Sequence, residues 1–182
     1  MCGIPLDLAH CACAEIPADV TMVRSVSSYT GWLREAVTAL KYQDECARAE
    51  HLGNHIAKLI ATLGDLDALT FVPLHRTRQR RRGYNQAELL ARVAGVRVGL
   101  PVLSALERTR ETASQVGLHA SERQLNVRGA FSFIAGVQLE GLRIALVDDV
   151  LTTGATVGAC AESLIQAGAH SVSVIVLARD KM

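Results

Sequence analysis

The chain has 182 residues, enough for one α/β domain with a small appendage; 49% of the residues are hydrophobic and 20% are charged. Its formal net charge is +1, so the overall charge does not indicate a nucleic-acid or membrane partner. No run of 18 apolar residues occurs, and the first residues lack a basic region followed by an apolar one. We therefore expect a cytoplasmic protein without membrane insertion. The chain has one Trp, three Tyr and three Phe, which are too few to indicate a surface on which nucleic-acid bases stack.

The first 19 residues differ from the rest, because they carry potential metal ligands and little hydrophobic periodicity. These ligands are Cys2, His10, Cys11 and Cys13. No C-x₂-C pair is present, and adjacent His10 and Cys11 would be strained as joint zinc ligands. The sequence predicts a degenerate or truncated zinc ribbon over residues 1–19, followed by one domain over 20–182.

Residues 20–29 alternate loosely and predict a strand, and two helical patterns follow, from Gly31 to Tyr42 and over 47–63. Lys41 near the end of the first helix has two interpretations. The slightly favoured one is a solvated cation at the helix end, and the other is a part of a phosphate site.

An apolar strand over 68–72 precedes a segment with five arginines in seven residues, 76–82, which is expected to be a loop before a helix over 85–93. Guanidinium groups bind phosphate oxygens in a bidentate manner, so Arg78, Arg80 and Arg82 are candidates for that role. The alternative is a solvated or nonspecific nucleic-acid-binding patch. A position after a strand of an α/β sheet favours the ligand site.

A strand is expected at 101–106 and an extended segment at 131–134, with a long polar segment between them. The polar stretch 107–130, with a possible helix over 121–127, has the length of a mobile lid or functional loop. Both remaining cysteines, Cys46 and Cys160, fall in helical patterns and are predicted to be buried.

The most informative stretch runs from Arg143 to Ala169. A short buried strand, 144–147, is followed by Asp148 and Asp149, a Thr-rich turn, and a helix whose apolar positions are spaced i, i+3, i+4, i+7 and i+8. Gly168 fits the end of that helix. The arrangement of a strand, a polar turn and the start of a helix can bind an anion. The two carboxylates can bind sugar hydroxyls or Mg²⁺. The pattern therefore fits a ribose 5-phosphate. The alternative is a threonine helix cap after a surface Asp-Asp pair.

Together with a last strand at 172–177, the pattern predicts a mostly parallel α/β sheet flanked by helices, with the polar loops at one end.

The segment from Val147 to Thr156 resembles the phosphoribosyl pyrophosphate (PRPP) motif of type I phosphoribosyltransferases, and the chain over 20–180 resembles their ComF family, which includes ComFC and GntX-like proteins. The matching blocks are Leu40-Lys41-Tyr42, Val72-Pro73-Leu74-His75, Arg78, Arg80, Arg82-Gly83-Tyr84-Asn85-Gln86, Arg110, Thr112, Gln115, Arg123, Asn126 and Arg128-Gly129-Ala130-Phe131.

The resemblance implies the type I phosphoribosyltransferase fold and a PRPP site. Asp148 and Asp149 would contact the ribose hydroxyls and Mg²⁺. The 5-phosphate would lie on Thr152, Thr153, Gly154, Ala155 and Thr156. Its pyrophosphate would face Arg78, Arg80 and Arg82. Arg110, Thr112 and Gln115 would belong to a flexible loop.

The resemblance also implies a role in natural transformation, with single-stranded DNA and competence proteins as partners. Family members often carry an N-terminal four-cysteine zinc finger, from which the Cys11-Ala12-Cys13 spacing departs. A family glycine shortly after Lys-Tyr is replaced by Gln43-Asp44-Glu45.

Three hypotheses remain at this stage: an active phosphoribosyltransferase, a PRPP sensor without catalysis, and an accessory factor that binds single-stranded DNA. No residue stands out as a general base, and the sequence identifies neither the acceptor nor the oligomeric state.

Overall fold

Four parallel strands form the central sheet of the computed structural model, which describes residues 20–42, 46–110 and 129–180. They lie in the order β1-β6-β5-β2, and every neighbouring pair is parallel. The strands are β1 (Val20–Ser28), β2 (Ala68–Phe71), β5 (Arg143–Leu151) and β6 (Ser171–Arg179). The predicted mostly parallel α/β sheet is therefore confirmed.

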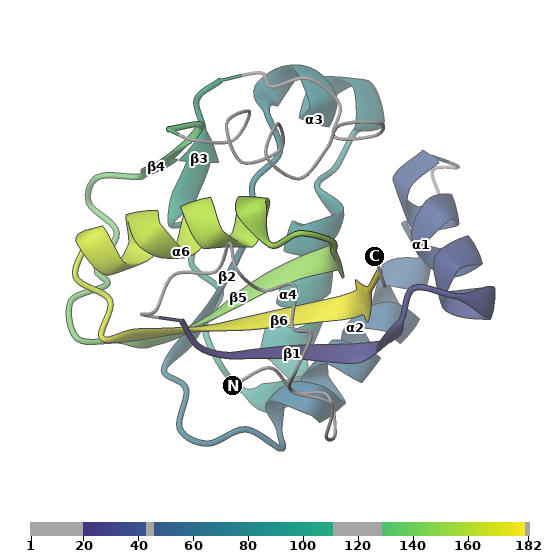
Figure 1. Cartoon of the computed structure of the whole chain (residues 1–182), viewed down its shortest axis with the longest axis horizontal. Helices are drawn as coiled ribbons and strands as arrows, with labels where there is room; N and C mark the ends of the chain where they lie inside the picture. Colours follow the sequence, from purple (N-terminus) through teal and green to yellow (C-terminus); the bar gives the residue numbers. More distant parts are fainter. Residues whose placement is uncertain (1–19, 43–45, 111–128, 181–182) are drawn as a thin grey trace.

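Helices cover both faces of this sheet (Figure 1). One face packs against α1 (Gly31–Tyr42), α2 (Arg48–Ile60) and α4 (Gln86–Val98), and the other against α6 (Ala155–Gln166). Successive side chains of a strand point to opposite faces, so β5 and β6 must be apolar on both. Within β5, Ile144 and Leu146 face α6, whereas Ala145 and Val147 belong to the other cluster.

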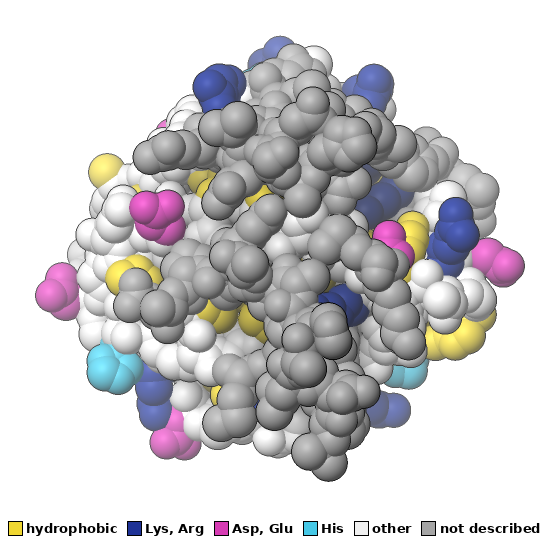
Figure 2. Space-filling view, in the orientation of Figure 1, with side chains coloured by type: hydrophobic (Ala, Val, Ile, Leu, Met, Phe, Trp, Pro, Cys, Tyr) yellow, Lys and Arg dark blue, Asp and Glu magenta, His cyan; other side chains and the backbone are white. Residues whose placement is uncertain are grey.

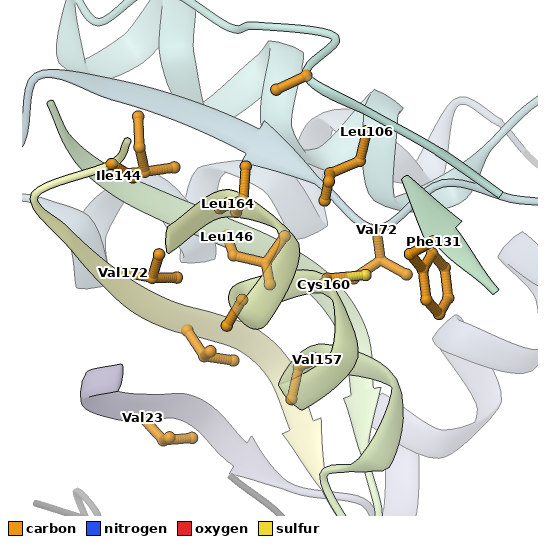
Figure 3. Packing of buried hydrophobic residues seen from close by; sticks show 14 of the residues in the cluster. Val23, Val72, Leu106, Phe131, Ile144, Leu146, Val157, Cys160, Leu164 and Val172 are labelled. Atoms are coloured by element: carbon orange, nitrogen blue, oxygen red, sulfur yellow. The ribbon is translucent and has the colours of Figure 1, made fainter. Parts of the chain in front are cut away.

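The predicted periodicity of α6 is confirmed by its packing. Val157, Cys160, Ala161 and Leu164 are buried, and Figure 3 shows Cys160 beside Val72 in the core. Gly168 has φ 100°, as expected for the glycine that follows a helix end. The second cysteine prediction is wrong, because Cys46 is exposed in a turn before α2.

The predicted strand at 101–106 is wrong in position. Only Val102 bridges to Leu69 of β2, and the strand β3 (Leu106–Arg108) begins where the prediction ends. It pairs antiparallel with β4 (Phe131–Phe133) in a separate two-stranded sheet, so this pair does not extend the central sheet. Two backbone hydrogen bonds make this short contact, from the Leu69 N–H to the Pro101 carbonyl and from the Leu103 N–H to the Leu69 carbonyl.

The arginine-rich segment is a helix, α3 (Arg76–Arg82), and not the predicted loop. His75 caps its start by accepting a hydrogen bond from the Thr77 N–H at 3.4 Å, and Gly83, with φ 83°, ends it. Arginine has a high helix propensity, and no glycine or proline interrupts residues 76–82. The predicted loop followed from the position of this segment between a strand and a helix, and charge alone does not oppose helix formation.

None of the helices within the described ranges combines the length and apolar character needed to cross a bilayer. The predicted division into 1–19 and 20–182 stays a prediction, because residues 1–19 lie outside the described part of the chain.

Close contact between α2 and α4 depends on Gly53. A Cβ atom at this position would lie 2.6 Å from the Val93 Cβ, which is closer than packed side chains approach. We expect Gly53→Ala to lower the free energy of unfolding by about 1–3 kcal/mol through overpacking, as measured by urea denaturation. Gly64→Ala is the matched control, because no atom lies within 4 Å of its Cβ position. Equal stability of the two variants would contradict this account.

Candidate functional site

A cleft of about 450 Å³ lies at the carboxyl ends of β2 and β5, where ligands of parallel α/β sheets bind. Segments distant in the sequence meet there because β2 and β5 are neighbours in the sheet. Its polar and turn-forming lining includes Tyr29, Lys41, Arg78, Arg82, Gln86, Arg108, Asp148, Asp149, Thr152, Gly154, Ala155, Thr156 and Asp180.

The Thr-rich turn between β5 and α6 forms one wall of the cleft. Thr152, Gly154, Ala155 and Thr156 line it, as predicted for a phosphate-binding turn. Gly154 has φ 95°, a left-handed conformation that directs the chain into α6 and that side chains oppose. The first N–H groups of α6 have no helical partner, which makes this wall suited to an anion.

Thr153 differs from its neighbours in this turn. Its side chain is 3% exposed, it does not line the cleft, and its Oγ1 accepts a hydrogen bond from the Ala155 N–H at 3.3 Å. The structure therefore does not bring this one hydroxyl to the predicted phosphate site. It stabilises the turn locally, the role that the alternative interpretation assigned to a threonine cap.

Asp148 and Asp149 are the last acidic residues of β5 and lie inside the strand rather than after it. Asp148 Oδ1 accepts a hydrogen bond from the Asp149 N–H at 2.8 Å. Burial in the cleft, followed by the negative charge of Asp149, raises the pKa of Asp148 to about 7. Asp149 Oδ2 is buried and has no hydrogen-bond partner among the described residues.

Lys41 reaches the acidic pair from α1, so it is not the solvated cation of the favoured interpretation. Its Nζ lies 2.7 Å from Asp149 Oδ1, and only 20% of the lysine side chain is exposed. Burial lowers the pKa of Lys41, but the charge of Asp149, the hydrogen bond to it and the charge of Asp148 act together with Tyr29 to raise this pKa above its usual value. The ammonium group is thus a permanent charge in the cleft at physiological pH.

Two of the three predicted arginines line the cleft. Arg78 and Arg82 are four residues apart on α3, which places them on the same face of the helix, and Arg82 donates a hydrogen bond to Gln86 Oε1. Arg80 is exposed and does not line the cleft, because it lies about 200° around the helix from Arg78. The prediction that Arg80 lies beside Arg78 and Arg82 assumed that this segment is a loop.

Sequence reasoning did not assign a site role to Arg108. This residue is 8% exposed, ends β3, lines the cleft, and lies over the Phe131 ring with its guanidinium carbon 5.2 Å from the ring centroid. The signal available was a pair of charged residues, Glu107 and Arg108, directly after an apolar stretch. The β3-β4 pairing, which places Arg108 opposite Phe131, could not be read from that pattern.

Tyr29 and Asp180 also line the cleft and were not predicted. They follow β1 and β6, whose carboxyl ends point the same way as those of β2 and β5. Arg110 is exposed and does not line the cleft, whereas Thr112 and Gln115 lie outside the described residues.

Metal binding by the acidic pair would need ligands from elsewhere. Across residues 20–42, 46–110 and 129–180, no group of three or more His, Cys, Asp or Glu side chains could hold a metal ion. Mg²⁺ commonly uses one or two carboxylates together with phosphate oxygens of a substrate, and the open Asp149 Oδ2 fits that arrangement. Cys2, Cys11 and Cys13, the predicted zinc ligands, lie outside the described residues.

No family model matches the chain. Competence protein F of Haemophilus influenzae is 38% identical over 135 residues, which cover 73% of this chain and 59% of that protein. The DNA utilization protein YhgH of Salmonella typhi is 35% identical over 188 aligned positions, which cover 98% of this chain and 82% of that protein. This chain belongs to the ComF family. The membership predicted from sequence is thus confirmed.

Among solved structures, the Bacillus subtilis glutamine PRPP amidotransferase in complex with ADP and GMP is similar to this ComF protein. The TM-score is 0.49 and the sequence identity is 25%, over 70% of this chain and 25% of that chain.

The raised pKa of Asp148 makes the ligand-free ComF site unfavourable for stability. An unfolded aspartate has a pKa of about 3.9, so ionisation of Asp148 costs more in the folded state, and this cost grows as the pH rises from about 4 to 7. Asp148→Asn removes the charge and keeps an oxygen for the Asp149 N–H. We expect the variant to exceed the parent protein in unfolding free energy by roughly 1–3 kcal/mol at pH 8 and to match it near pH 4, as measured by urea denaturation.

Asp149→Asn is the contrasting variant, because it removes the carboxylate that pairs with Lys41 and should destabilise the protein at pH 8. An Asp148→Asn variant less stable than the parent at pH 8 would contradict the electrostatic account.

Proposed function

We propose that this ComF protein binds PRPP in the cleft between β2 and β5 and transfers its phosphoribosyl group to an acceptor. The observation that supports this best is the convergence of three chemical groups in one cleft: the Thr152–Thr156 turn, the acidic pair, and the arginines Arg78, Arg82 and Arg108. They match a phosphate, a sugar with hydroxyls, and a pyrophosphate.

Each part of the ligand has a complementary wall. The 5-phosphate would bind the N–H groups at the start of α6 and the hydroxyls of Thr152 and Thr156. The ribose hydroxyls would donate to the carboxylates of Asp148 and Asp149. The pyrophosphate would face Arg78 and Arg82, whose guanidinium groups suit its oxygens.

The proposed reaction breaks the bond between ribose C1 and the pyrophosphate oxygen and forms a bond from C1 to a nucleophilic atom of the acceptor. Positive charge develops on the ribose ring and negative charge on pyrophosphate as the bond breaks. The carboxylates of Asp148 and Asp149 would stabilise the first charge, and the arginines the second. The bond electrons leave with pyrophosphate, and the acceptor's proton passes to solvent or to a base.

Mg²⁺ fits this site as a shared ligand of the protein and the substrate. Asp148 and Asp149 would hold it together with PRPP oxygens, and it would neutralise charge on the pyrophosphate.

Thermal unfolding with millimolar PRPP and Mg²⁺ tests the ligand assignment. A ligand at a hundredfold excess over its Kd stabilises the folded state by about 2.7 kcal/mol, so a Tm increase of about 5 °C or more is expected. Asp148→Ala combined with Asp149→Ala should abolish the increase. No shift in the parent protein would overturn the assignment.

Gly154→Ala should also remove the response to PRPP, because alanine opposes the φ of 95° that shapes the turn. The matched control is Gly136→Ala. Gly136 has a similar φ of 91° but lies between β4 and β5 and does not line the cleft, so its variant should keep the shift.

Release of pyrophosphate in the presence of candidate acceptors separates transfer from sensing. PRPP binding with release in the presence of an acceptor supports the transferase, whereas binding without release across a broad acceptor panel favours a PRPP sensor.

Binding of single-stranded DNA is a second candidate function, favoured by arginines of α3 that point away from the cleft. Arg76, Arg80 and Arg81 are exposed and do not line it, and Figure 2 shows Lys and Arg side chains at the upper edge, where Figure 1 places α3 and β3. The relatives named for competence and DNA utilization make DNA a natural ligand to test.

Replacing Arg80 and Arg81 with Ala should weaken DNA binding and reduce the slope of log K against log salt by about 1.4, or about 0.7 for each lost phosphate contact. The stabilisation by PRPP should persist. The charge-matched control replaces Arg92 and Arg97, two exposed arginines of α4, and should leave the slope unchanged. Equal effects of both pairs would show nonspecific attraction only.

A further inference from the structure

The Lys41–Asp149 pair is unusually shielded for a lysine at the end of a helix. The distance between Nζ and Oδ1 is 2.7 Å, with 20% of the lysine side chain and 5% of the aspartate side chain exposed. Exposed lysines at helix ends interact with solvent and contribute little to stability. Lys41 instead places a fixed positive charge against one oxygen of the acidic pair.

The backbone directly before Lys41 is anchored by a residue distant in the sequence. The Tyr84 hydroxyl donates a hydrogen bond to the Leu40 carbonyl at 2.5 Å, directly before Lys41. Tyr84 lies between α3 and α4, next in the chain after the helix that carries Arg78 and Arg82. The end of α1 is therefore tied to the arginine-bearing segment, and both contribute to the same cleft.

The acidic pair retains an acceptor for a ligand. Lys41 occupies Asp149 Oδ1 and the Asp149 N–H occupies Asp148 Oδ1. Asp149 is 3% exposed, borders the cleft, and its Oδ2 is buried without a hydrogen-bond partner among the described residues. An orphaned carboxylate oxygen of this kind is costly unless a ligand satisfies it.

We propose that Lys41 is a positioning residue that holds Asp149 and takes the place of a cation in the free protein, so that a divalent metal enters only together with a phosphorylated ligand. The inference deepens the proposed function, because it assigns the order in which the same site is filled. The inference concerns the charges of Lys41 and Asp149, and the binding of a metal ion serves to probe these charges.

Electrostatics gives the physical reason. A metal on Asp149 Oδ2 would lie roughly 5 Å from the Lys41 ammonium, and two positive charges at that distance in a shielded cleft repel strongly. Phosphate oxygens that arrive with the metal bring negative charge, which offsets this repulsion. Without these phosphate oxygens, the acidic pair attracts a metal ion only weakly, because Lys41 already neutralises the carboxylate of Asp149.

Binding of Mn²⁺ to the full-length protein without PRPP tests the proposal, with the bound fraction measured by electron paramagnetic resonance. Lys41→Met should bind Mn²⁺ at least tenfold more tightly than the parent protein, because it removes the positive charge that repels the metal ion. Lys41→Arg keeps the charge and should stay as weak as the parent. The gain should disappear in Lys41→Met combined with Asp149→Asn.

Circular dichroism and thermal unfolding establish that each variant is folded. If Lys41→Met is not folded, Lys41→Gln replaces it, because glutamine is neutral and still donates a hydrogen bond to Asp149; the same gain is expected. A folded neutral variant that binds Mn²⁺ no more tightly than the parent overturns the proposal, as does a Lys41→Arg variant that gains affinity.

The two proposals fail separately. Loss of the PRPP-induced Tm shift in the parent protein overturns the PRPP assignment, whereas the Mn²⁺ comparison needs no PRPP.

Discussion

Burial of two adjacent carboxylates at the end of β5 is the constraint on which the site depends. Like charges in a shielded cleft repel, and the raised pKa of Asp148 is a direct result of burial and of the charge on Asp149. Lys41 compensates Asp149, whereas Asp148 forms no ion pair of its own within the described part of the chain. A fold that needed only stability would gain by replacing this pair, so its presence argues for a ligand that interacts with it.

The rest of the cleft is arranged around that pair by strand order. Since β2 and β5 are adjacent and parallel, the segment after Phe71 and the turn after Leu151 emerge at one edge of the sheet. Asn85 ties the segment after Phe71 to the start of α4, because it donates to the Val72 carbonyl at 3.0 Å and accepts from the Ala87 N–H. The segment between Val72 and Asn85, which carries Arg78 and Arg82, therefore starts from a fixed point of the core.

Membership of the ComF family and the cleft geometry address different questions. Two of the relatives are named for competence and for DNA utilization, and DNA is the ligand of the second proposed function. The proposed site for a phosphorylated sugar is the cleft, and the outer arginines of α3 lie apart from it. The two proposed functions use different surfaces and therefore do not exclude each other.

The sequence by itself determined the elements whose signals are local. Short apolar runs located β5 and β6, helical spacing located α6, and the resemblance of residues 147–156 identified the acidic pair and the turn, because these residues are contiguous in the chain.

Prediction from the sequence failed where the outcome depends on partners distant in the sequence. Residues 101–106 were expected to form one strand, whereas β3 begins at Leu106 and pairs with β4. Tertiary structure alone decided that Lys41 is a shielded partner of Asp149, that Arg108 enters the cleft, and that Arg80 turns away from it. Each of these outcomes depends on the direction in which a helix or strand faces its neighbours, which no local pattern encodes.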